Sequence, residues 1–274
     1  MTIIFDGNDY ATKKKLLLQI SSDRVRELGI IPHVATILIG DNPGSVKYSE
    51  LKRKYIESLG CQVDIYKLPT NVKFEEIKLL VNTLNNDKTV HGIMVQMPLP
   101  ETIKEYRLKI IDLISKNKDI DGLRDDSDYL HPTSKAILEI LALAIHDTKI
   151  DIKSVCVVGA TGMVGKPLVK ELNKFKFNVV EADINTTDLN LKTIDADCIV
   201  SATGVMNLIT PEMVKDEVIL IDVGYPEGDI SPVASEKASF ITPVPGGVGP
   251  VTITCLAENL ILAAQSTIVS SDVN

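Results

Sequence analysis

Several residue types are scarce in this 274-residue chain: tryptophan is absent, aromatic residues make up 4%, and there are four cysteines. Few aromatic side chains leave few platforms on which single-stranded nucleic acid could stack. The cysteines lie far apart without a Cys-x-x-Cys pair, and three of them sit in apolar runs. We therefore expect buried free thiols rather than disulfides or a zinc site, which fits a reducing cytoplasm. The four are Cys61, Cys156, Cys198 and Cys255.

Long runs of one residue class are also missing. The net charge is −8 without a long basic block, so no nucleic-acid surface is expected, because phosphate contacts need clustered lysine and arginine. The N-terminus lacks the residue order of a signal peptide. The most apolar stretch, residues 251–270, is interrupted by Glu258, Asn259 and Gln265 and falls short of the roughly 18 apolar residues of a membrane span. We expect a cytoplasmic protein with a small-molecule partner and neither a nucleic-acid nor a membrane partner.

The composition, 45% apolar and 24% charged, is typical of a soluble protein with a sizeable core. Segments with apolar residues at helical spacing alternate with short β-rich runs, which favours a parallel sheet covered by helices. The alternation stops in the polar stretch 115–135 and then restarts. Expected helices are 12–27, 45–61, 74–87, 101–114, 136–147 and 167–175, and expected strands are 33–40, 62–69, 90–100, 154–159, 178–183, 197–204, 218–224 and 240–247.

These patterns predict an α/β protein with two α/β domains. The first spans residues 1–118, and the second spans residues 119–251 and is a Rossmann-like parallel-sheet domain. Strands of the second domain are almost continuously apolar, as in a sheet buried on both faces. A last helix covers about 252–274, and its periodicity does not indicate which domain it packs on.

A glycine-rich run, GATGMVG at 159–165, follows an apolar strand and precedes a helix. In that context glycines let the backbone approach a pyrophosphate at a helix N-terminus. The spacing is GxxGxxG rather than GxGxxG, and the alternative is a tight turn without a ligand. Asp183 lies 18 residues beyond Gly165 at the end of the next apolar strand. That is the expected place for an acid that binds the adenosine ribose, whereas a surface aspartate is the alternative.

A second unusual run is PVPGGVGPVT at 243–252, with three glycines and three prolines in ten positions. Such density excludes helix and strand, fixes the backbone and exposes main-chain N–H groups. It favours a rigid ligand-contacting loop over a purely structural turn.

Four polar residues of the first half are further candidates. Tyr48 and Lys52 share one face of a helix because they are four residues apart. Gln96 follows an apolar strand, and strand C-termini are where open α/β sheets bind ligands. Asp121 lies at the junction of the two domains. Each residue alone is better explained as a solvated or core-edge side chain.

Taken in order, the segments resemble the methylene-tetrahydrofolate dehydrogenase/cyclohydrolase family, also called FolD. Besides the two glycine-rich runs, the resemblance includes IIFDG near the start and four further motifs. The Ser-x-x-Tyr-x-x-x-Lys pattern and PVPGGVGPVT are the most specific. The further motifs are GDNPGSVKYSELK at 40–52, VQMPLP at 95–100, KDIDG at 118–122 and IDVG at 221–224.

The resemblance implies a folate-binding catalytic first domain, a folate cleft between the domains, a C-terminal helix that returns to the first domain, and a homodimer. It implies oxidation of 5,10-methylene-tetrahydrofolate by a nicotinamide cofactor, then hydrolysis of the methenyl product to 10-formyl-tetrahydrofolate. Lys52 would act as general base and acid if burial lowers its pKa, and Gln96 would orient its amine. Tyr48 would stack on the folate and Asp121 would accept hydrogen bonds from the pterin. No metal is expected.

The same resemblance implies the remaining site residues. Substrate-binding residues are Ser45, Tyr48, Asp121, Pro98, Leu99, Gly246, Gly247 and Pro250. Cofactor-binding residues are Gly159, Ala160, Thr161, Met163, Val164, Gly165, Asp183, Asn185, Thr186, Thr203 and Gly204.

Departures from the family pattern leave two cofactors open. Ala160 stands where the family usually has an arginine that meets the 2′-phosphate of NADP, and Asp183 stands where it commonly has histidine. A carboxylate accepts a bond from a ribose hydroxyl and repels a phosphate, so the local physics favours NAD. Members of the family usually use NADP, which favours that cofactor. Asn185, Thr186 and Thr187 could donate hydrogen bonds to its phosphate. His131-Pro132-Thr133-Ser134 also replaces the family's Pro-Cys-Thr-Pro.

Two other functions fit parts of the pattern. The altered nucleotide loop is compatible with a cyclohydrolase whose dehydrogenase step is weak. A non-catalytic dinucleotide sensor on the same fold is the alternative from another class, although it gives no reason for Tyr48, Lys52, Gln96 and Asp121 to occur together.

Overall fold

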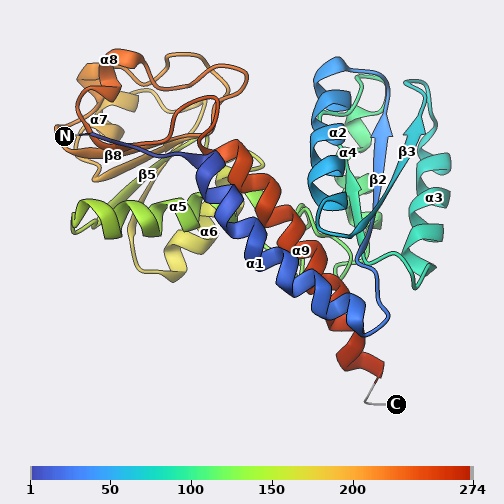
Figure 1. Cartoon of the computed structure of the whole chain (residues 1–274). Helices are drawn as coiled ribbons and strands as arrows, with labels where there is room; N and C mark the ends of the chain where they lie inside the picture. Colours follow the sequence, from blue (N-terminus) through green and yellow to red (C-terminus); the bar gives the residue numbers. More distant parts are fainter. Residues whose placement is uncertain (1, 272–274) are drawn as a thin grey trace. The chain divides into compact units, whose positions relative to one another are not determined.

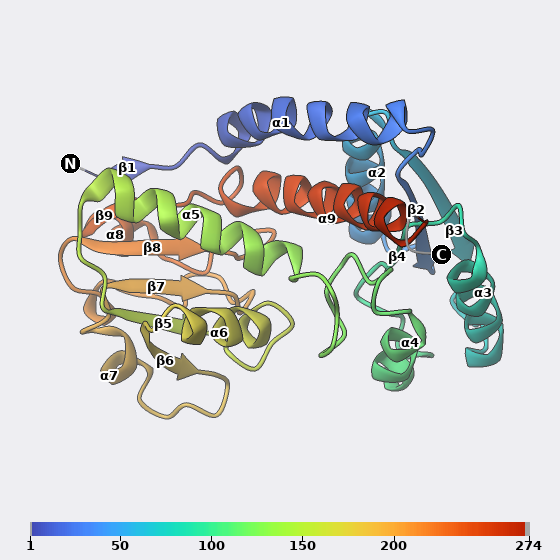
Figure 2. The same ribbon diagram turned by 90° about the horizontal axis from the view of Figure 1, so that it is seen from below.

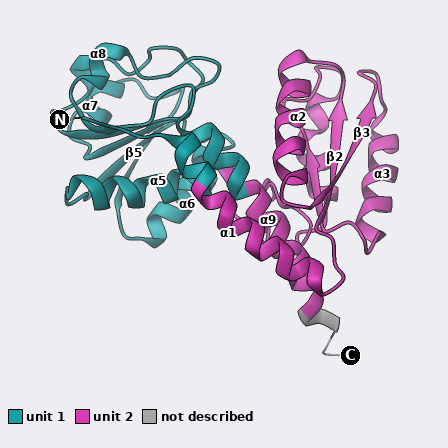
Figure 3. Cartoon of the chain, viewed as in Figure 1, with its two compact units in different colours: residues 1–12, 133–255 teal, residues 13–132, 256–274 magenta. Residues whose placement is uncertain are grey.

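The computed structural model describes residues 2–271 and divides the chain into two compact α/β units. Unit 1 comprises Met1–Thr12 and Thr133–Cys255, and unit 2 comprises Lys13–Pro132 and Leu256–Asn274 (Figure 3). Each unit has its own parallel sheet. The predicted fold class, two α/β domains with a dinucleotide-type sheet in the second, is confirmed.

Unit 1 contains a six-stranded parallel sheet in the order β1-β9-β8-β7-β5-β6 (Figure 2). Almost every residue of β5, β7 and β8 is buried, which explains their continuous apolar sequence. The strand order reverses between β5 and β7, so the crevice outside their carboxyl ends is the expected ligand position. The strands are β1 (Ile3–Ile4), β5 (Ser154–Val158), β6 (Asn178–Ala182), β7 (Cys198–Ser201), β8 (Val218–Asp222) and β9 (Ala238–Ile241), and the helices are α5 (Pro132–Thr148), α6 (Gly165–Lys174), α7 (Leu189–Thr193) and α8 (Pro232–Ser235), with a 3-10 turn at Pro211–Met213.

Unit 2 contains a three-stranded parallel sheet in the order β3-β2-β4, with α2 and α3 beside it (Figure 1). The central strand β2 is buried along its whole length. Its elements are β2 (His33–Ile39), α2 (Pro43–Glu57), β3 (Gln62–Leu68), α3 (Phe74–Asn86), β4 (Gly92–Val95), a 3-10 turn (Lys104–Tyr106) and α4 (Arg107–Leu113).

Two long helices contribute residues to both units: α1 (Gly7–Glu27) and α9 (Val248–Ser271). Their unit 2 parts lie side by side in Figures 1 and 2, where Lys14 Nζ is 2.7 Å from Glu258 Oε2. The stretch Val248–Ile268 is long and apolar enough to cross a membrane by length and composition. Packing accounts for this character, because Cys255 lies in the unit 1 core and Leu256 and Leu260 lie in the unit 2 core.

The compact units differ from the predicted domains in two places. Residues 1–12 belong to unit 1 because β1 pairs with β9, a pairing across the whole chain that local sequence does not indicate. The boundary in the middle of the chain lies between residues 132 and 133, whereas the predicted domain boundary lies between residues 118 and 119. The polar segment between these positions is bonded to unit 2, where Ile93 N donates to Lys118 O at 2.7 Å and Arg124 Nη1 donates to Ile114 O at 3.0 Å.

A buried histidine at the start of β4 makes the stability of unit 2 dependent on pH. His91 is 7% exposed, and its Nδ1 accepts a hydrogen bond from His33 N at 3.2 Å. Desolvation lowers the pKa of His91 to about 4, with a smaller contribution from His33. The folded state therefore keeps a neutral imidazole that the unfolded chain protonates below about pH 6.5.

We predict that the native state loses stability through His91 as the pH falls from 6.5 toward 4, because unfolding then takes up a proton. Relative to His91→Asn, whose Oδ1 can replace Nδ1 as acceptor, the wild type should lose about 2–3 kcal/mol more between pH 7 and pH 4.5. Urea unfolding of both proteins at the two pH values measures this difference. Equal losses in the two proteins would contradict the prediction.

Candidate active site

A stripe of buried polar side chains runs along α2. Pro43 opens the first turn of the helix, and the Asn42 side chain accepts a hydrogen bond from Ser45 N at 3.0 Å, which fixes where the helix begins. Ser45, Ser49 and Lys52 are buried at intervals of four and three residues. That spacing places all three on one helix face. Three buried polar residues on one helix face indicate a site rather than a solvated surface.

Lys52 ends this stripe in a pocket of neutral partners. Its Nζ donates to Gln96 Oε1 and approaches Met94 Sδ, both at 3.3 Å, and lies 4.8 Å from the centre of the Tyr48 ring. The side chain is only 7% exposed. Burial lowers the pKa of Lys52, whereas the nearby charge of Asp121 raises it. Tyr48 and Gln96 therefore contact Lys52, and the charge of Asp121 acts on it. The four predicted residues come together in unit 2.

Gln96 is held at the carboxyl end of β4 so that its oxygen faces the amine. Its backbone N donates to Ile37 O at 2.9 Å, and its side-chain Nε2 donates to Met97 O at 2.6 Å. Because Nε2 is engaged by the main chain, Oε1 is left to accept from Lys52, and Ser49 Oγ lies 3.5 Å from the same oxygen. This geometry orients the amine without adding a charge.

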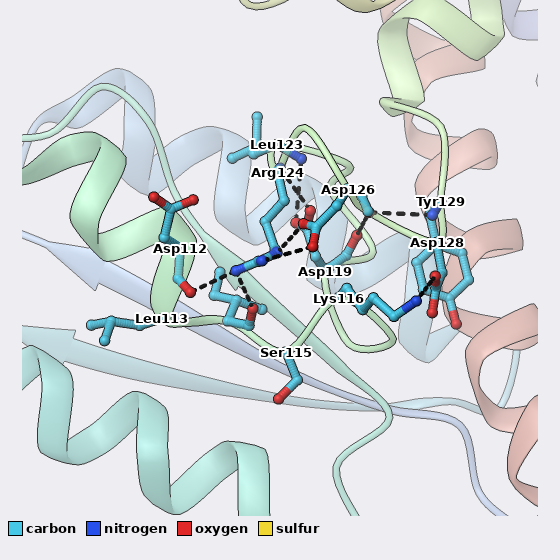
Figure 4. A network of polar contacts seen from close by, with 12 residues as sticks. Asp112, Leu113, Ser115, Lys116, Asp119, Leu123, Arg124, Asp126, Asp128 and Tyr129 are labelled. Carbon is cyan, nitrogen blue, oxygen red and sulfur yellow. Dashed lines mark hydrogen bonds and ion pairs between the residues drawn. The ribbon is translucent and has the colours of Figure 1, made fainter.

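The segment that carries Asp121 is tied down by a dense polar network (Figure 4). Asp119 is fully buried and its carboxylate accepts from Leu123 N at 3.3 Å and Arg124 N at 2.9 Å, which closes a turn around Asp121. Desolvation raises the pKa of Asp119 to about 6. Sequence reasoning used only the second acid of KDIDG and missed this first one, which builds the turn.

Arg124 continues this network outward. Its guanidinium donates to Asp126 through Nε and Nη2 and to the carbonyl of Ile114 through Nη1 (Figure 4). Ser127 Oγ donates to Asp119 O at 3.0 Å. The polar stretch that the sequence indicated only as a junction is thus an ordered support for Asp121.

Two residues near Asp121 were not predicted as site residues. His131 is 8% exposed; burial lowers its pKa, and the charges of Asp121 and Lys52 act on it in opposite directions. Asn259 of α9 donates to Ile120 O and Leu130 O, both at 2.9 Å. The only sequence signals were the unusual His-Pro-Thr-Ser stretch and a polar residue inside an apolar helix.

The remaining predicted substrate-binding residues differ in burial and are divided between the two units. Ser45 Oγ is buried without a hydrogen-bond partner among the described residues. Pro98 is exposed after a cis peptide bond, and Leu99 lies in the apolar core beside β4. Three others, Gly246, Gly247 and Pro250, belong to unit 1.

Of the run 243–252, residues 243–247 form a loop, but α9 begins at Val248, so the expectation that the run excludes helix was wrong for its second half. The loop packs against the N-terminal turn of the chain. Gly7 N donates to Gly246 O at 2.9 Å, and a Cβ at Gly7 would lie 1.9 Å from Gly247 O. Gly246 has φ +101°, in the region that favours glycine. The close backbone approach explains why IIFDG and PVPGG both end in glycine, and it makes the loop rigid.

The glycine turn after β5 has the form that a dinucleotide requires. Gly159 has φ +91°, and a Cβ there would lie 2.6 Å from Ala202 O. A Cβ at Gly165 would lie 2.2 Å from Gly159 O, so the turn closes directly onto the first residue of α6. Ser134 Oγ donates to Val164 O at 2.9 Å and braces the turn. Thr161 and Met163 are exposed, whereas Ala160 is 3% exposed.

Asp183 follows β6 directly beside this turn, because Gly159 N and Ala160 N both donate to Ala182 O. Its Oδ1 accepts from Asn185 N at 2.9 Å, and Thr186 Oγ1 accepts from Asp183 N at 2.9 Å. The acid therefore stabilises its own turn through one oxygen and is partly exposed.

The loop after β7 is shaped by a buried acid that the sequence reasoning did not select. Asp229 Oδ2 accepts from Thr203 N at 2.7 Å, Thr203 Oγ1 at 2.8 Å and Ser201 Oγ at 2.8 Å. Gly204 has φ +70° and its N donates to the same oxygen at 3.3 Å. Thr203 and Gly204 thus lie at the strand-order reversal, next to the glycine turn across β5 and β7.

Comparison with known proteins identifies the family of the chain. The family model for the tetrahydrofolate dehydrogenase/cyclohydrolase catalytic domain matches residues 5–121, and the model for the NAD(P)-binding domain of the same family matches residues 131–268. The bifunctional protein FolD of Campylobacter jejuni subsp. jejuni is 36% identical over 284 residues, which cover 97% of this chain and 99% of that protein.

Solved structures give the same result. The crystal structure of the FolD enzyme from Campylobacter jejuni superposes with a TM-score of 0.91 at 35% identity, covering 97% of this chain and 100% of that one. FolD from Trypanosoma brucei, solved with NADP cofactor and an inhibitor, has a TM-score of 0.88 at 29% identity, with coverage of 97% and 98%. The chain therefore belongs to the tetrahydrofolate dehydrogenase/cyclohydrolase family, as its sequence motifs predicted.

Proposed function

We propose that this chain is a bifunctional enzyme of one-carbon folate metabolism. It oxidises 5,10-methylene-tetrahydrofolate with a nicotinamide dinucleotide and hydrolyses the resulting methenyl compound to 10-formyl-tetrahydrofolate. The observation that carries the proposal is the buried amine of Lys52, which is held by Gln96 and Tyr48 on the family's own motif. Family membership supplies the substrate, and the site chemistry supports both steps.

Binding and orientation of the folate are assigned to Tyr48 and Asp121. The Tyr48 ring offers a flat apolar surface to a planar heterocycle, and the Asp121 carboxylate can accept paired hydrogen bonds from a pterin amino group and ring N–H. The buried Ser45 hydroxyl, which has no partner among the described residues, is available to a bound ligand. Together these groups would hold the one-carbon unit within reach of Lys52.

Hydrolysis of the methenyl cation takes two protons from the attacking water, delivers one to the ring nitrogen and releases the other to solvent. The neutral amine of Lys52 accepts the first proton from water as the new C–O bond forms at the methenyl carbon. The resulting ammonium gives a proton to the ring nitrogen as the C–N bond breaks, and the hydroxyl proton of the adduct passes to solvent as the C=O bond of the formyl group forms on the other nitrogen. A lowered pKa of Lys52 suits this exchange because it makes the neutral amine easier to reach than in an exposed lysine.

We predict that Lys52→Met lowers the cyclohydrolase rate by about 10²-fold or more, because the amine is lost while the apolar stem is kept. The decay of methenyl-tetrahydrofolate absorbance, corrected for the enzyme-free rate, measures this. Lys54→Met, which removes an exposed lysine from the same helix, is the matched control and should retain the wild-type rate.

The pH profile gives a second test of Lys52. Its lowered pKa should appear as an acidic limb, with the rate falling as the pH drops and the amine becomes protonated. The residual rate of Lys52→Met should lack that limb. A Lys52→Met enzyme with a rate within twofold of wild type would refute the assignment of Lys52 as general base and acid. A wild type that hydrolyses no faster than the enzyme-free control would instead favour the non-catalytic sensor.

The residues at the carboxyl ends of β5, β6 and β7 fit a nicotinamide dinucleotide. The cradle formed by Gly159 and Gly165 has no room for a side chain, so main-chain atoms can approach a pyrophosphate. The bound nicotinamide would accept the hydride in the first step. Asp183 would face the adenosine ribose, and Thr203 and Gly204 would line the nicotinamide side.

Between the two dinucleotides, we propose that this chain uses NAD more readily than relatives with an arginine in the glycine loop. Ala160 is buried and uncharged, so it offers nothing to a 2′-phosphate. The carboxylate of Asp183 has a second oxygen beyond the one that accepts from Asn185 N. It can accept from a ribose hydroxyl and repels a phosphate. NADP, the cofactor in the Trypanosoma brucei structure, is the alternative.

We predict that Asp183→Ser raises the ratio of kcat/KM for NADP over NAD by about tenfold, equivalent to about 1.4 kcal/mol. Serine can keep an acceptor for Asn185 N while it removes the charge. Initial rates with each dinucleotide measure the ratio. Asp195→Ser makes the same charge change before the amino end of β7 and should leave the ratio unchanged. An unchanged ratio in Asp183→Ser would show that the acid does not face the ribose.

A cyclohydrolase with weak dehydrogenase activity is the second candidate, favoured by the uncharged Ala160. It would show hydrolysis of methenyl-tetrahydrofolate but no reduction of either dinucleotide with the methylene substrate. The homodimer and the cytoplasmic location stay predictions from the sequence.

A further inference from the structure

Asn259 is a buried polar residue in the apolar part of α9. It is 2% exposed, and its Nδ2 donates to the main-chain carbonyls of Ile120 and Leu130, each at 2.9 Å. These carbonyls belong to segments ten residues apart that have no regular secondary structure. One amide group therefore joins two irregular stretches of unit 2 to a helix.

Each of these carbonyls immediately precedes a residue beside Lys52. Asp121 follows Ile120, and His131 follows Leu130; both influence the charge state of Lys52 or are influenced by it. The segments touch each other as well. Gly122 has φ +59°, and a Cβ at Gly122 would lie 2.5 Å from His131 N. A movement of either segment would thus be transmitted to the other.

The opposite side of the Asp121 segment is fixed by β4. Ile93 N donates to Lys118 O at 2.7 Å, and the missing side chain of Gly92 leaves room for Ile120, whose Cδ1 would lie 2.7 Å from a Cβ there. Ile120 itself is fully buried. The segment is therefore held between β4, which also carries Gln96 at its end, and α9.

An asparagine is specifically suited to the α9 side. Its amide nitrogen carries two N–H donors, one for each carbonyl, on a short and neutral side chain. An apolar residue of similar size would leave one buried and one partly buried carbonyl without this donor, and an aspartate would place acceptors against acceptors.

We infer that Asn259 is a positioning residue of the folate site, which fixes Asp121 and His131 relative to Lys52 by binding the two carbonyls that precede them. The inference rests on the proposed function for its substrate. It assigns a role in substrate binding to the unit 2 part of α9, which has no other role in the proposed mechanism.

Loss of the Asn259 hydrogen bonds should change the pKa of Lys52 in a definite direction. The negative charge of Asp121 raises the pKa of Lys52 against the effect of burial. The two hydrogen bonds of Asn259 form a clamp on the segments that carry Asp121 and His131. If Asp121 moves away from Lys52 when this clamp is lost, the opposing contribution of its charge shrinks and the pKa of Lys52 falls further. The acidic limb of the hydrolysis profile should then move to lower pH. His131 also interacts electrostatically with Lys52, so His131→Asn in the same background controls for its titration.

The test compares Asn259→Leu with the wild type by three measurements. Calorimetric titration with tetrahydrofolate should show at least a tenfold weaker Kd. The KM for methylene-tetrahydrofolate should rise by a similar factor while the KM for the dinucleotide changes less than twofold. The acidic limb of the cyclohydrolase profile should shift to lower pH in Asn259→Leu and in Asn259→Leu/His131→Asn alike.

Thr254→Val is the matched control for damage to α9. Its buried hydroxyl bonds only a carbonyl of the same helix among the hydrogen bonds described, so its loss perturbs the helix without touching the clamp. A general loss of stability would lower the Tm of both variants and leave the ratio of the two KM values unchanged. A variant Asn259→Leu that folds, binds tetrahydrofolate like wild type and keeps the acidic limb would overturn the inference.

The outcomes also separate this inference from the proposed function. If the wild type does not bind tetrahydrofolate, the proposed function fails. If the wild type binds and Asn259→Leu binds equally well, only the positioning role fails. Should Asn259→Leu not fold, Asn259→Ser, which keeps one donor on a smaller side chain, is expected to give an intermediate Kd, and a wild-type Kd in Asn259→Ser would contradict the clamp.

Discussion

The burial of one amine, that of Lys52, is the constraint on which the rest of unit 2 depends. An ammonium removed from water costs several kcal/mol unless charged groups compensate for it. Here its direct contacts are an amide oxygen, a thioether and an aromatic ring, and Asp121 is the group of opposite charge that acts on it among residues 2–271. Burial therefore shifts Lys52 toward the neutral amine while Asp121 opposes that shift, which is the arrangement that the proposed proton transfer uses.

That balance explains why so much of the surrounding structure is rigid. The position of Asp121 sets how far burial can lower the pKa of Lys52, so a loosely held acid would leave the amine with no fixed proton affinity. Buried Asp119 closes the turn on one side, β4 fixes the segment on another, and Asn259 holds it from α9. Each support uses main-chain hydrogen bonds, which tolerate less movement than contacts between exposed side chains.

The sequence predicted the parts of this design that follow local rules. Helical spacing placed Tyr48 and Lys52 on one face, and an apolar run followed by a polar residue placed Gln96 at a strand end. It did not predict the pairing of β1 with β9 or the bonds of Asn259, since these join residues more than a hundred positions apart. The roles of Asp119 and Asp229 were also missed, because a buried acid that binds backbone N–H groups has the same sequence signature as a surface acid.

Asp183 shows how one residue can satisfy a local rule and a functional one together. Its Oδ1 accepts from Asn185 N and closes the turn after β6, a role that asparagine, serine or threonine could also fill. The turn alone thus gives no reason for a full negative charge. A negative charge at this position disfavours the binding of a phosphate. It is useful where a ribose hydroxyl must be bound and a phosphate rejected. With the buried, neutral Ala160 beside it, the proposed preference for NAD gives a reason for the carboxylate that the turn does not give.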